Sequence, residues 1–91
     1  MPKLLQESEI TKRLAKIPGW KREGSEISRQ YKFSDFVAAM VFVNFVAGEA
    51  EKMDHHPDIL IQYSKVKLTL STHSAGGLTD NDFALAQKID A

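Results

Sequence analysis

The stretch from Phe36 to Pro57 reads FVAAMVFVNFVAGEAEKMDHHP and decides the fold of this chain. From Phe36 to Ala47 every position except Asn44 is apolar. The run is too short for a membrane span, which takes about 20 residues, and is typical of a buried helix. We predict a helix that continues to about Met53, with Ser34 as its cap and Asp35 in its first turn. Because its apolar positions surround the axis, it should pack against a sheet and also against something else.

Toward the N-terminus, the sequence predicts a helix followed by a hairpin. Ser8 can cap a helix over about 9–16, which Pro18-Gly19 ends. From Trp20 the apolar positions recur every second residue, which indicates strands over about 20–23 and 27–33 with a turn at Gly24-Ser25. Arg29 interrupts the apolar face of the second strand.

Toward the C-terminus, the pattern predicts a second hairpin and a last helix. The strands cover about 59–63 and 65–72, and in the return strand apolar and polar residues alternate up to His73. Thr79 and Asp82 form a variant of the capping box for a helix over about 80–90, and Leu78 and Phe83 are placed as a hydrophobic staple.

The order of elements defines the fold class. Helix, hairpin, long helix, hairpin and helix give an α+β fold with a four-stranded antiparallel sheet and helices packed on one face, in the order α-β-β-α-β-β-α. No repeat, linker or low-complexity segment interrupts the 91 residues, so we expect a single domain over 1–91.

Composition narrows the classes of partner. Twelve basic residues balance twelve acidic residues, so no positive field is available to gather nucleic acid or to bind an anionic membrane surface. The absence of cysteine removes disulfides, thiolate nucleophiles and cysteine-based metal sites, and fits a cytoplasmic setting. The first ten residues, MPKLLQESEI, lack the apolar run of a secretory signal.

The end of the long helix carries the residues with most chemistry. If the helix persists, Glu51 and His55 are four residues apart on one face, so the carboxylate can orient the imidazole. Asp54 could do the same for the neighbouring ring. Pro57 forces His56 out of helical geometry, so the two rings should diverge. His73 ends the strand that returns from the second hairpin, so the three histidines could converge.

Each of these features also has an ordinary structural interpretation. A His-His pair in a loop is often solvated surface, Ser71-Thr72-His73 is a plausible strand exit, Asp82 can be only a helix cap, and Trp20 can be only the edge of the core. Three histidines also suggest zinc, copper or iron. However, no His-x-His or His-x-x-x-His spacing is present, so we predict no metal site.

The whole motif resembles the signature of the pterin-4a-carbinolamine dehydratases. The positions that carry it are Glu51, His55, His56, Pro57, Tyr63, His73 and Asp82. The resemblance extends to surrounding segments and covers about residues 10–90. These segments are Gly19-Trp20, Phe33 to Phe36, KVKLTLSTH from Lys65 to His73, and Gly77-Leu78.

The resemblance implies an enzyme that dehydrates a 4a-hydroxytetrahydropterin by acid and base catalysis, without a metal or a redox cofactor. It assigns His55 and His73 to proton transfer and His56 mainly to pterin binding. Glu51 and Asp54 would orient histidines or meet the amide-like edge of the ring. The remaining residues implied at the substrate site are Ser71, Thr72, Trp20 and Asp82.

The resemblance also implies protein partners. Some members of the family form dimers or tetramers through the apolar helix, and some act as coactivators that bind the dimerisation segment of a transcription factor. We therefore expect a homo-oligomer that a charge at Phe42 or Val43, whichever faces outward, should disrupt. A protein-binding module is the alternative to the enzyme.

Overall fold

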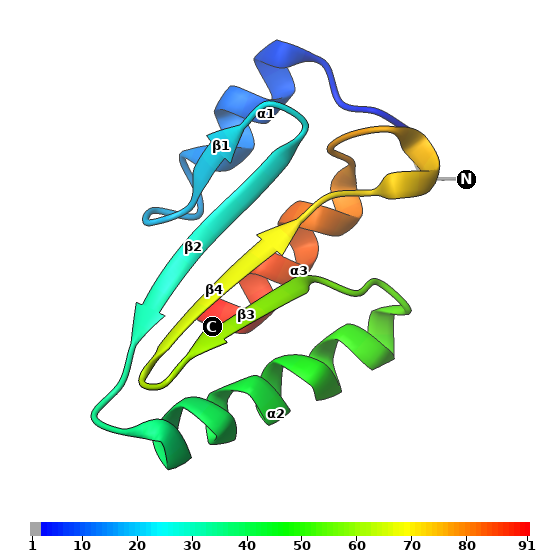
Figure 1. The fold of residues 1–91 in the computed structure, drawn as a ribbon. Helices are drawn as coiled ribbons and strands as arrows, with labels where there is room; N and C mark the ends of the chain where they lie inside the picture. The colour runs from blue at the N-terminus through cyan, green and yellow to red at the C-terminus, as the bar shows by residue number, and fades with distance from the viewer. Residues whose placement is uncertain (1–2) are drawn as a thin grey trace.

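The computed structural model describes residues 3–91, which form a single four-stranded sheet with helices packed against it (Figure 1). The elements follow one another in the predicted order, with one additional 3₁₀ turn, η1, before the last helix. They are α1 (Glu7–Leu14), β1 (Lys21–Glu23), β2 (Glu26–Lys32), α2 (Phe36–Met53), β3 (Asp58–Gln62), β4 (Lys65–Leu70), η1 (His73–Ala75) and α3 (Asp80–Asp90).

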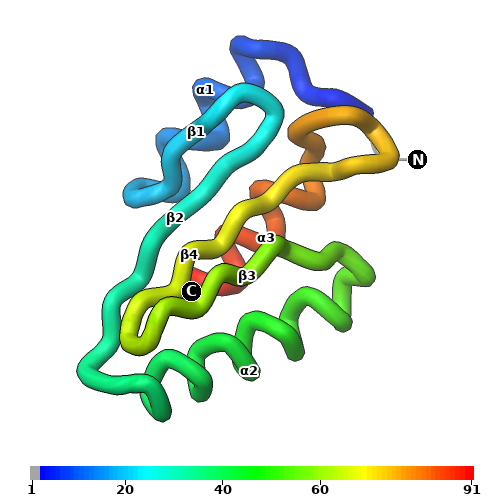
Figure 2. The backbone as a smooth tube through the Cα atoms, in the orientation of Figure 1, coloured from blue at the N-terminus to red at the C-terminus, as the bar shows by residue number. Residues whose placement is uncertain are grey.

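All strands of the sheet are antiparallel, in the order β1-β2-β4-β3. β4 is central, and its register places Leu70 opposite Ile27 and Leu68 opposite both Arg29 and Ile59. The smooth backbone trace shows α3 passing behind β4 and β3, while α2 lies beyond the β3 edge (Figure 2). The end of α2 and the start of α3 are thereby brought toward the same end of the sheet (Figure 1).

The two faces of the sheet differ as the alternation predicts. Ile27, Val66, Leu68 and Leu70 are fully buried and belong to the core, whereas the intervening positions of β3 and β4 are exposed or only partly buried. Buried and exposed positions alternate along the strands because helices cover one face of the sheet and water covers the other. The predicted packing of helices on one face is therefore confirmed.

Two of the predicted helix caps are wrong. Asp35, not Ser34, is the N-cap of α2, and its side chain accepts a hydrogen bond from the Ala38 amide at 2.8 Å. α1 begins at Glu7 after Gln6, which makes no side-chain cap, so Ser8 lies inside the helix. α2 begins two residues after Ser34, and α1 begins one residue before Ser8, so neither Ser occupies the N-cap position. The Thr79–Asp82 capping box of α3 is present as predicted.

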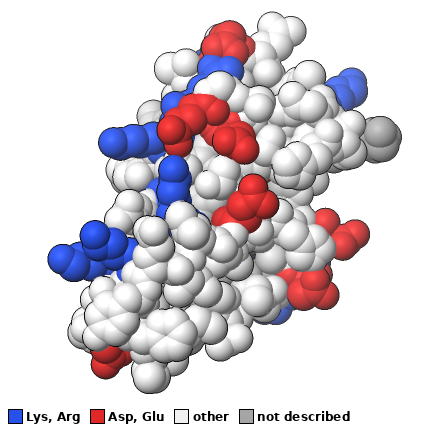
Figure 3. Space-filling view, viewed as in Figure 1, with Lys and Arg blue, Asp and Glu red and all other residues white. Residues whose placement is uncertain are grey.

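One side of α2 packs on the core and the other is exposed. Ala39, Val46 and Ala50 are buried, and the Phe42 ring lies 4.5 Å from the ring of Tyr31. Four large apolar side chains of α2 are 45–70% exposed, and we refer to them as the α2 stripe: Phe36, Val37, Val41 and Phe45. Figure 3 shows a broad area without charged side chains at the α2 side of the molecule.

The inward-facing and outward-facing positions of α2 differ from those expected. Phe42 and Val43 are only partly exposed and pack against the core, so neither is an outward-facing position.

Among residues 3–91, no helix has both the length and the apolar character that crossing a membrane requires.

Candidate active site

His55 is positioned by the way α2 ends. Asp54 adopts a left-handed conformation (φ 51°, ψ 42°), and the His55 amide donates to the carbonyl oxygen of Ala50 at 3.1 Å. This turn stops the helix and directs His55 inward, so that only 8% of the residue is exposed. Pro57 lies directly before β3, where a further helical turn is disfavoured.

The buried ring of His55 contacts a buried carboxylate. Its Nε2 lies 2.6 Å from Oδ1 of Asp82, which is the third residue of α3 and is 0% exposed. The other carboxylate oxygen, Oδ2, accepts hydrogen bonds from the Thr72 hydroxyl and from the Thr79 amide, both at 2.9 Å. Asp82 therefore completes the capping box of α3, as predicted, and also contacts a histidine.

The predicted pairing of Glu51 with His55 is wrong. Oε1 of Glu51 lies 2.6 Å from Nε2 of His56, and both side chains are largely exposed. The predicted pair requires the helix to continue for four residues after Glu51, but α2 ends at Met53 and the left-handed turn at Asp54 rotates the chain. Consequently Glu51 contacts the ring five residues away. The two rings do diverge, since one is buried and the other is exposed.

His73 lies outside the strand that was expected to carry it. β4 ends at Leu70, and His73 is exposed at the first position of η1. Thr72 bridges to Gly77, and its carbonyl oxygen accepts hydrogen bonds from the amides of Ala75 and Gly76 at 3.0 Å. The loop that presents His73 is thus closed on Thr72, the residue whose hydroxyl contacts Asp82.

The other predicted site residues, Ser71, Asp54 and Trp20, form no hydrogen bond with His55 or Asp82 in the described chain. The Ser71 hydroxyl donates to the carbonyl oxygen of Ser25 at 2.8 Å, so it joins the hairpin turn to β4. Asp54 is exposed and acts as the C-cap, and its side chain contacts neither His55 nor His56 through a hydrogen bond in the described chain. Trp20 lies elsewhere, against the other end of α3.

The sequence did not reveal the cluster that holds Trp20. Asp90 accepts hydrogen bonds from Trp20 Nε1 at 2.7 Å, from Arg29 Nη1 at 3.0 Å and from the Tyr31 hydroxyl at 2.6 Å. Eight residues of helix separate Asp82 from Asp90, or about 12 Å along the axis, so Trp20 does not flank the His55 site. Arg29, the one charge on the apolar face of β2, was the available signal that an acidic partner existed.

Burial raises the pKa of the Tyr31 hydroxyl well above its ordinary value, and the hydrogen bond to the Asp90 carboxylate acts in the same direction. The Arg29 guanidinium, 4.8 Å from the centre of the Tyr31 ring, opposes this effect. These groups join the C-terminal end of α3 to β2, so the cluster has a structural role.

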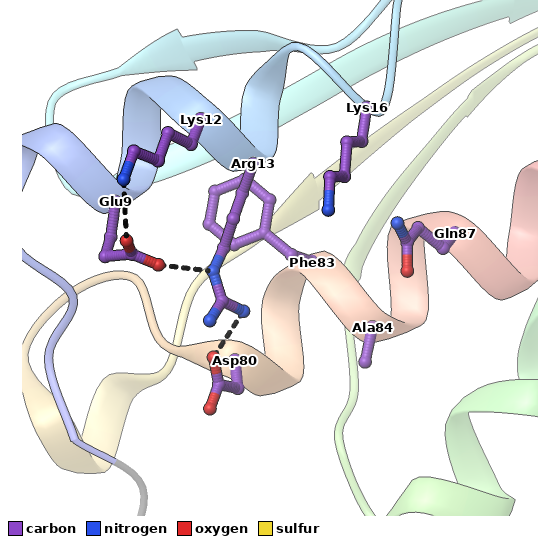
Figure 4. A pocket seen from close by; sticks show the side chains of 8 residues that line it. All are labelled: Glu9, Lys12, Arg13, Lys16, Asp80, Phe83, Ala84 and Gln87. Atoms are coloured by element: carbon purple, nitrogen blue, oxygen red, sulfur yellow. Dashed lines mark hydrogen bonds and ion pairs between the residues drawn. The ribbon is translucent and has the colours of Figure 1, made fainter.

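Three cavities on the described surface are lined by residues other than the histidines. A cavity of about 400 Å³ opens between α1 and α3, where Arg13 is paired with Glu9 and with Asp80 and where Lys16 and Gln87 line the rim (Figure 4). Two further cavities, of about 360 and 260 Å³, are lined by residues near Arg29 and near Leu4. No histidine lines any of these three cavities.

The described residues also contain no ready-made metal site. Over positions 3–91, no three or more His, Cys, Asp or Glu side chains are arranged so that they could hold a metal ion. His55 and His56 each contact a different carboxylate, and His73 contacts neither of these carboxylates through a hydrogen bond.

The comparisons with known proteins point to one family. The family model for pterin 4 alpha carbinolamine dehydratase matches residues 3–91. A provisionally named pterin-4-alpha-carbinolamine dehydratase of Acidobacterium capsulatum is 55% identical over 87 residues, covering 96% of this chain and 95% of that protein. A protein of Chloroflexus aurantiacus with the same provisional name is 52% identical and covers 99% of this chain and 96% of its own length.

Two solved structures are also similar. The crystal structure of a transcriptional coactivator/pterin dehydratase from Brucella melitensis superposes with a TM-score of 0.90 at 40% identity, over 94% of each chain. A pterin dehydratase-like protein identified as a RuBisCO assembly factor in the alpha-carboxysome gives a TM-score of 0.67 at 21% identity, over 79% of this chain and 86% of that one. The second likeness concerns the fold alone.

The α+β fold and these matches therefore define a known class, the pterin dehydratases. The chain is a member of the pterin-4a-carbinolamine dehydratase family, whose activity is that of a hydro-lyase.

Proposed function

We propose that this protein removes water from 4a-hydroxytetrahydropterin, giving quinonoid dihydropterin, by histidine acid and base catalysis. The observation that carries the proposal is the buried contact between His55 and Asp82, beside the exposed His56 and next to the loop that presents His73. A surface histidine needs no such partner, whereas a histidine that transfers protons benefits from a fixed orientation.

The chemistry requires two proton transfers. One group must protonate the hydroxyl that leaves C4a, and another must accept the proton of N5 as the C=N bond forms. The water that departs carries away the leaving oxygen, and no electron is gained or lost. Imidazole has an unperturbed pKa near 6.5, so it can serve as acid or as base near neutral pH. Such catalysis typically contributes about 10²–10⁴-fold to the rate.

We assign proton transfer to His55 and His73. His55 is restrained by Asp82, and His73 is exposed on a closed loop that begins beside the same carboxylate. His56 is assigned mainly to pterin binding, since its exposed ring is oriented by Glu51. Asp54 and the backbone around Thr72 are candidates for contacting the amide-like edge of the pterin.

No redox cofactor is required, because dehydration changes no oxidation state. No metal is required either, since the lone pair of N5 expels the protonated hydroxyl from the neighbouring carbon as water. We also propose that the protein supports tetrahydrobiopterin recycling in the cytoplasm, a setting that a chain without cysteine fits.

The experiment that tests the proposal is a direct assay. The purified protein is added to freshly generated 4a-hydroxytetrahydropterin, and the appearance of quinonoid dihydropterin is followed by absorbance. We expect a rate that rises in proportion to protein concentration above the spontaneous rate. A rate that stays at the spontaneous value at every protein concentration would refute the function.

A second function is favoured by a separate observation, the exposed α2 stripe. Contiguous apolar side chains of this size are seldom left in water, and burying one fully is worth about 1.5–3 kcal/mol. We propose that the stripe mediates self-association, and that a protein partner could use the same surface. The Brucella melitensis relative is described as a transcriptional coactivator as well as a pterin dehydratase, which supports this second role. Variants that lack the histidines should lose dehydratase activity and keep any binding by α2.

A further inference from the structure

A chain of buried hydrogen bonds surrounds Asp82, and its direction can be worked out from the groups involved. The Thr72 hydroxyl has one proton, which it donates to Oδ2 of Asp82. The Thr79 hydroxyl lies 2.7 Å from the Thr72 hydroxyl and must therefore be the donor in that contact. Its own oxygen accepts a hydrogen bond from the Asn81 amide at 3.3 Å. Every proton of the chain thus points toward the carboxylate.

The same reasoning fixes the protonation of His55. An ionised carboxylate is only an acceptor, and Oδ2 already receives hydrogen bonds from Thr72 and from the Thr79 amide. Oδ1 then receives its hydrogen bond from Nε2 of His55, so Nε2 carries a proton. In the neutral ring, Nδ1 therefore holds the lone pair.

Nδ1 of His55 is also the nitrogen that can be reached. No hydrogen bond to Nδ1 is found within residues 3–91. Yet no buried side-chain nitrogen or oxygen in this part of the chain lacks a hydrogen-bond partner, so Nδ1 must be in contact with solvent. The ring is held by one nitrogen and open at the other.

We propose that Asp82 is a positioning residue, fixed by Thr72 and Thr79, which holds His55 so that Nδ1 is the nitrogen that exchanges a proton with the pterin. This inference rests on the proposed function and assigns Asp82 and the Thr72 hydroxyl a role other than contacting substrate. The network joins three segments: the end of α2 through His55, the exit of β4 through Thr72, and the start of α3 through Thr79 and Asp82. Because His73 directly follows Thr72, the same carboxylate sets the position of both proton-transfer segments.

The test uses Asp82→Asn and a matched control. The new carboxamide can keep its oxygen on Thr72 and Thr79 and so preserve the cap, but it places an NH₂ group against Nε2 of His55. That group can only donate, so the ring must move its proton to Nδ1. Asp80→Asn removes a charge from the same first turn of α3 without touching His55, because Asp80 is exposed and pairs with Arg13.

Two readouts are measured on the full chain. The tautomer of His55 is read from ¹⁵N chemical shifts of the ring at alkaline pH, with His55→Gln to assign the signals. We expect the Nε2–H form in the wild type and in Asp80→Asn, and the Nδ1–H form in Asp82→Asn. In the dehydration assay, Asp82→Asn should lower kcat by about 10²-fold or more with KM changed by less than about threefold.

The possible results separate this inference from the function itself. An Nδ1–H ring in the wild type would overturn the positioning role, and this measurement needs no activity. If the wild type is active and Asp82→Asn matches Asp80→Asn in kcat, the inference is also overturned. If Asp82→Asn does not fold, Thr72→Val is measured instead, because it removes one hydrogen-bond donor to the carboxylate. It should lower kcat by about tenfold while the ring of His55 stays in the Nε2–H form. Unchanged kcat in Thr72→Val would count against the network. A wild type without activity but with the Nε2–H ring would refute the function and leave the geometry of the network supported.

Discussion

Nε2 of His55 lies 2.6 Å from Oδ1 of Asp82, although 27 residues separate them in the chain. His55 follows the longest helix, and Asp82 caps the last one. Their contact joins the two helices at the end of the sheet where the loop of His73 begins. Burying such a pair carries a desolvation penalty unless the other oxygen of the carboxylate also accepts hydrogen bonds. Here the Thr72 hydroxyl and the Thr79 amide donate to that oxygen.

His56 is expected to act in binding. His56→Ala should raise KM for the pterin about tenfold and change kcat by less than about threefold, because the exposed ring is hydrogen-bonded to Glu51 and is not part of the buried network. Glu51→Gln should give a smaller change in the same direction. Steady-state kinetics over a range of pterin concentrations measures both constants. If His56→Ala instead lowered kcat and left KM unchanged, the division of roles among the histidines would be wrong.

Metal removal should leave the enzyme active. Exhaustive dialysis against a chelator should not change the dehydration rate, because histidine acid catalysis and the lone pair of N5 together expel water without a Lewis acid. Elemental analysis should find far less than one transition metal ion per chain. Activity that disappears on chelation and returns with zinc would reverse this expectation, since a metal would then be activating the leaving hydroxide.

The α2 stripe should hold copies of the chain together. Val41→Glu, at a position that is 65% exposed, should lower the mass measured by light scattering toward the monomer mass of 10.2 kDa, because a charge would be buried in the contact. Leu60→Glu is the matched control, since Leu60 is 53% exposed on β3 and lies outside the stripe. A wild type that stays monomeric at micromolar concentration would contradict the proposal. An assembly that Leu60→Glu disrupts and Val41→Glu does not would place the contact on the sheet.

Tyr31 should make the protein less stable at alkaline pH. Burial and Asp90 raise the pKa of its hydroxyl in the folded state, so the unfolded chain releases this proton first. The contribution to stability is therefore complete below the unfolded pKa of about 10 and is lost as pH rises toward the folded pKa.

Tyr31→Phe should reduce the free energy of unfolding by about 1–2 kcal/mol at neutral pH, which is the range for a partly exposed hydrogen bond to a charged group. The difference from the wild type should shrink above about pH 10. Urea unfolding at neutral pH and above about pH 10 measures this difference in the free energy of unfolding. Tyr63→Phe, at an exposed position, is the control. A difference that stays constant with pH would show that Tyr31 ionises equally in both states.

The fold could be predicted because its signals are local. The change from helical spacing to alternation, the Gly24-Ser25 turn and the Thr79–Asp82 box each specify an element without reference to the rest of the chain. The caps at Ser8 and Ser34 failed because a helix can begin at a neighbouring residue, and tertiary packing decides between them.

The site could be predicted only as a set of residues. The motif identified His55, His56, His73 and Asp82, but their pairing depends on where α2 ends, and no sequence signal fixed the left-handed turn at Asp54. The bond from Trp20 to Asp90 spans 70 residues and depends on the packing of α3 against β2. Distances of this kind follow from the assembled sheet and not from the local pattern.

The central claim is that His55 and His73 transfer the protons of dehydration, and its most direct test is the turnover rate of His55→Ala and His73→Ala. Each purified variant is compared with the wild type on 4a-hydroxytetrahydropterin at saturating concentration, after circular dichroism has shown that it is folded. The proposal predicts that each substitution lowers the enzymatic rate above background by at least about tenfold, since each removes a group that transfers a proton. A wild-type rate in either folded variant would contradict it.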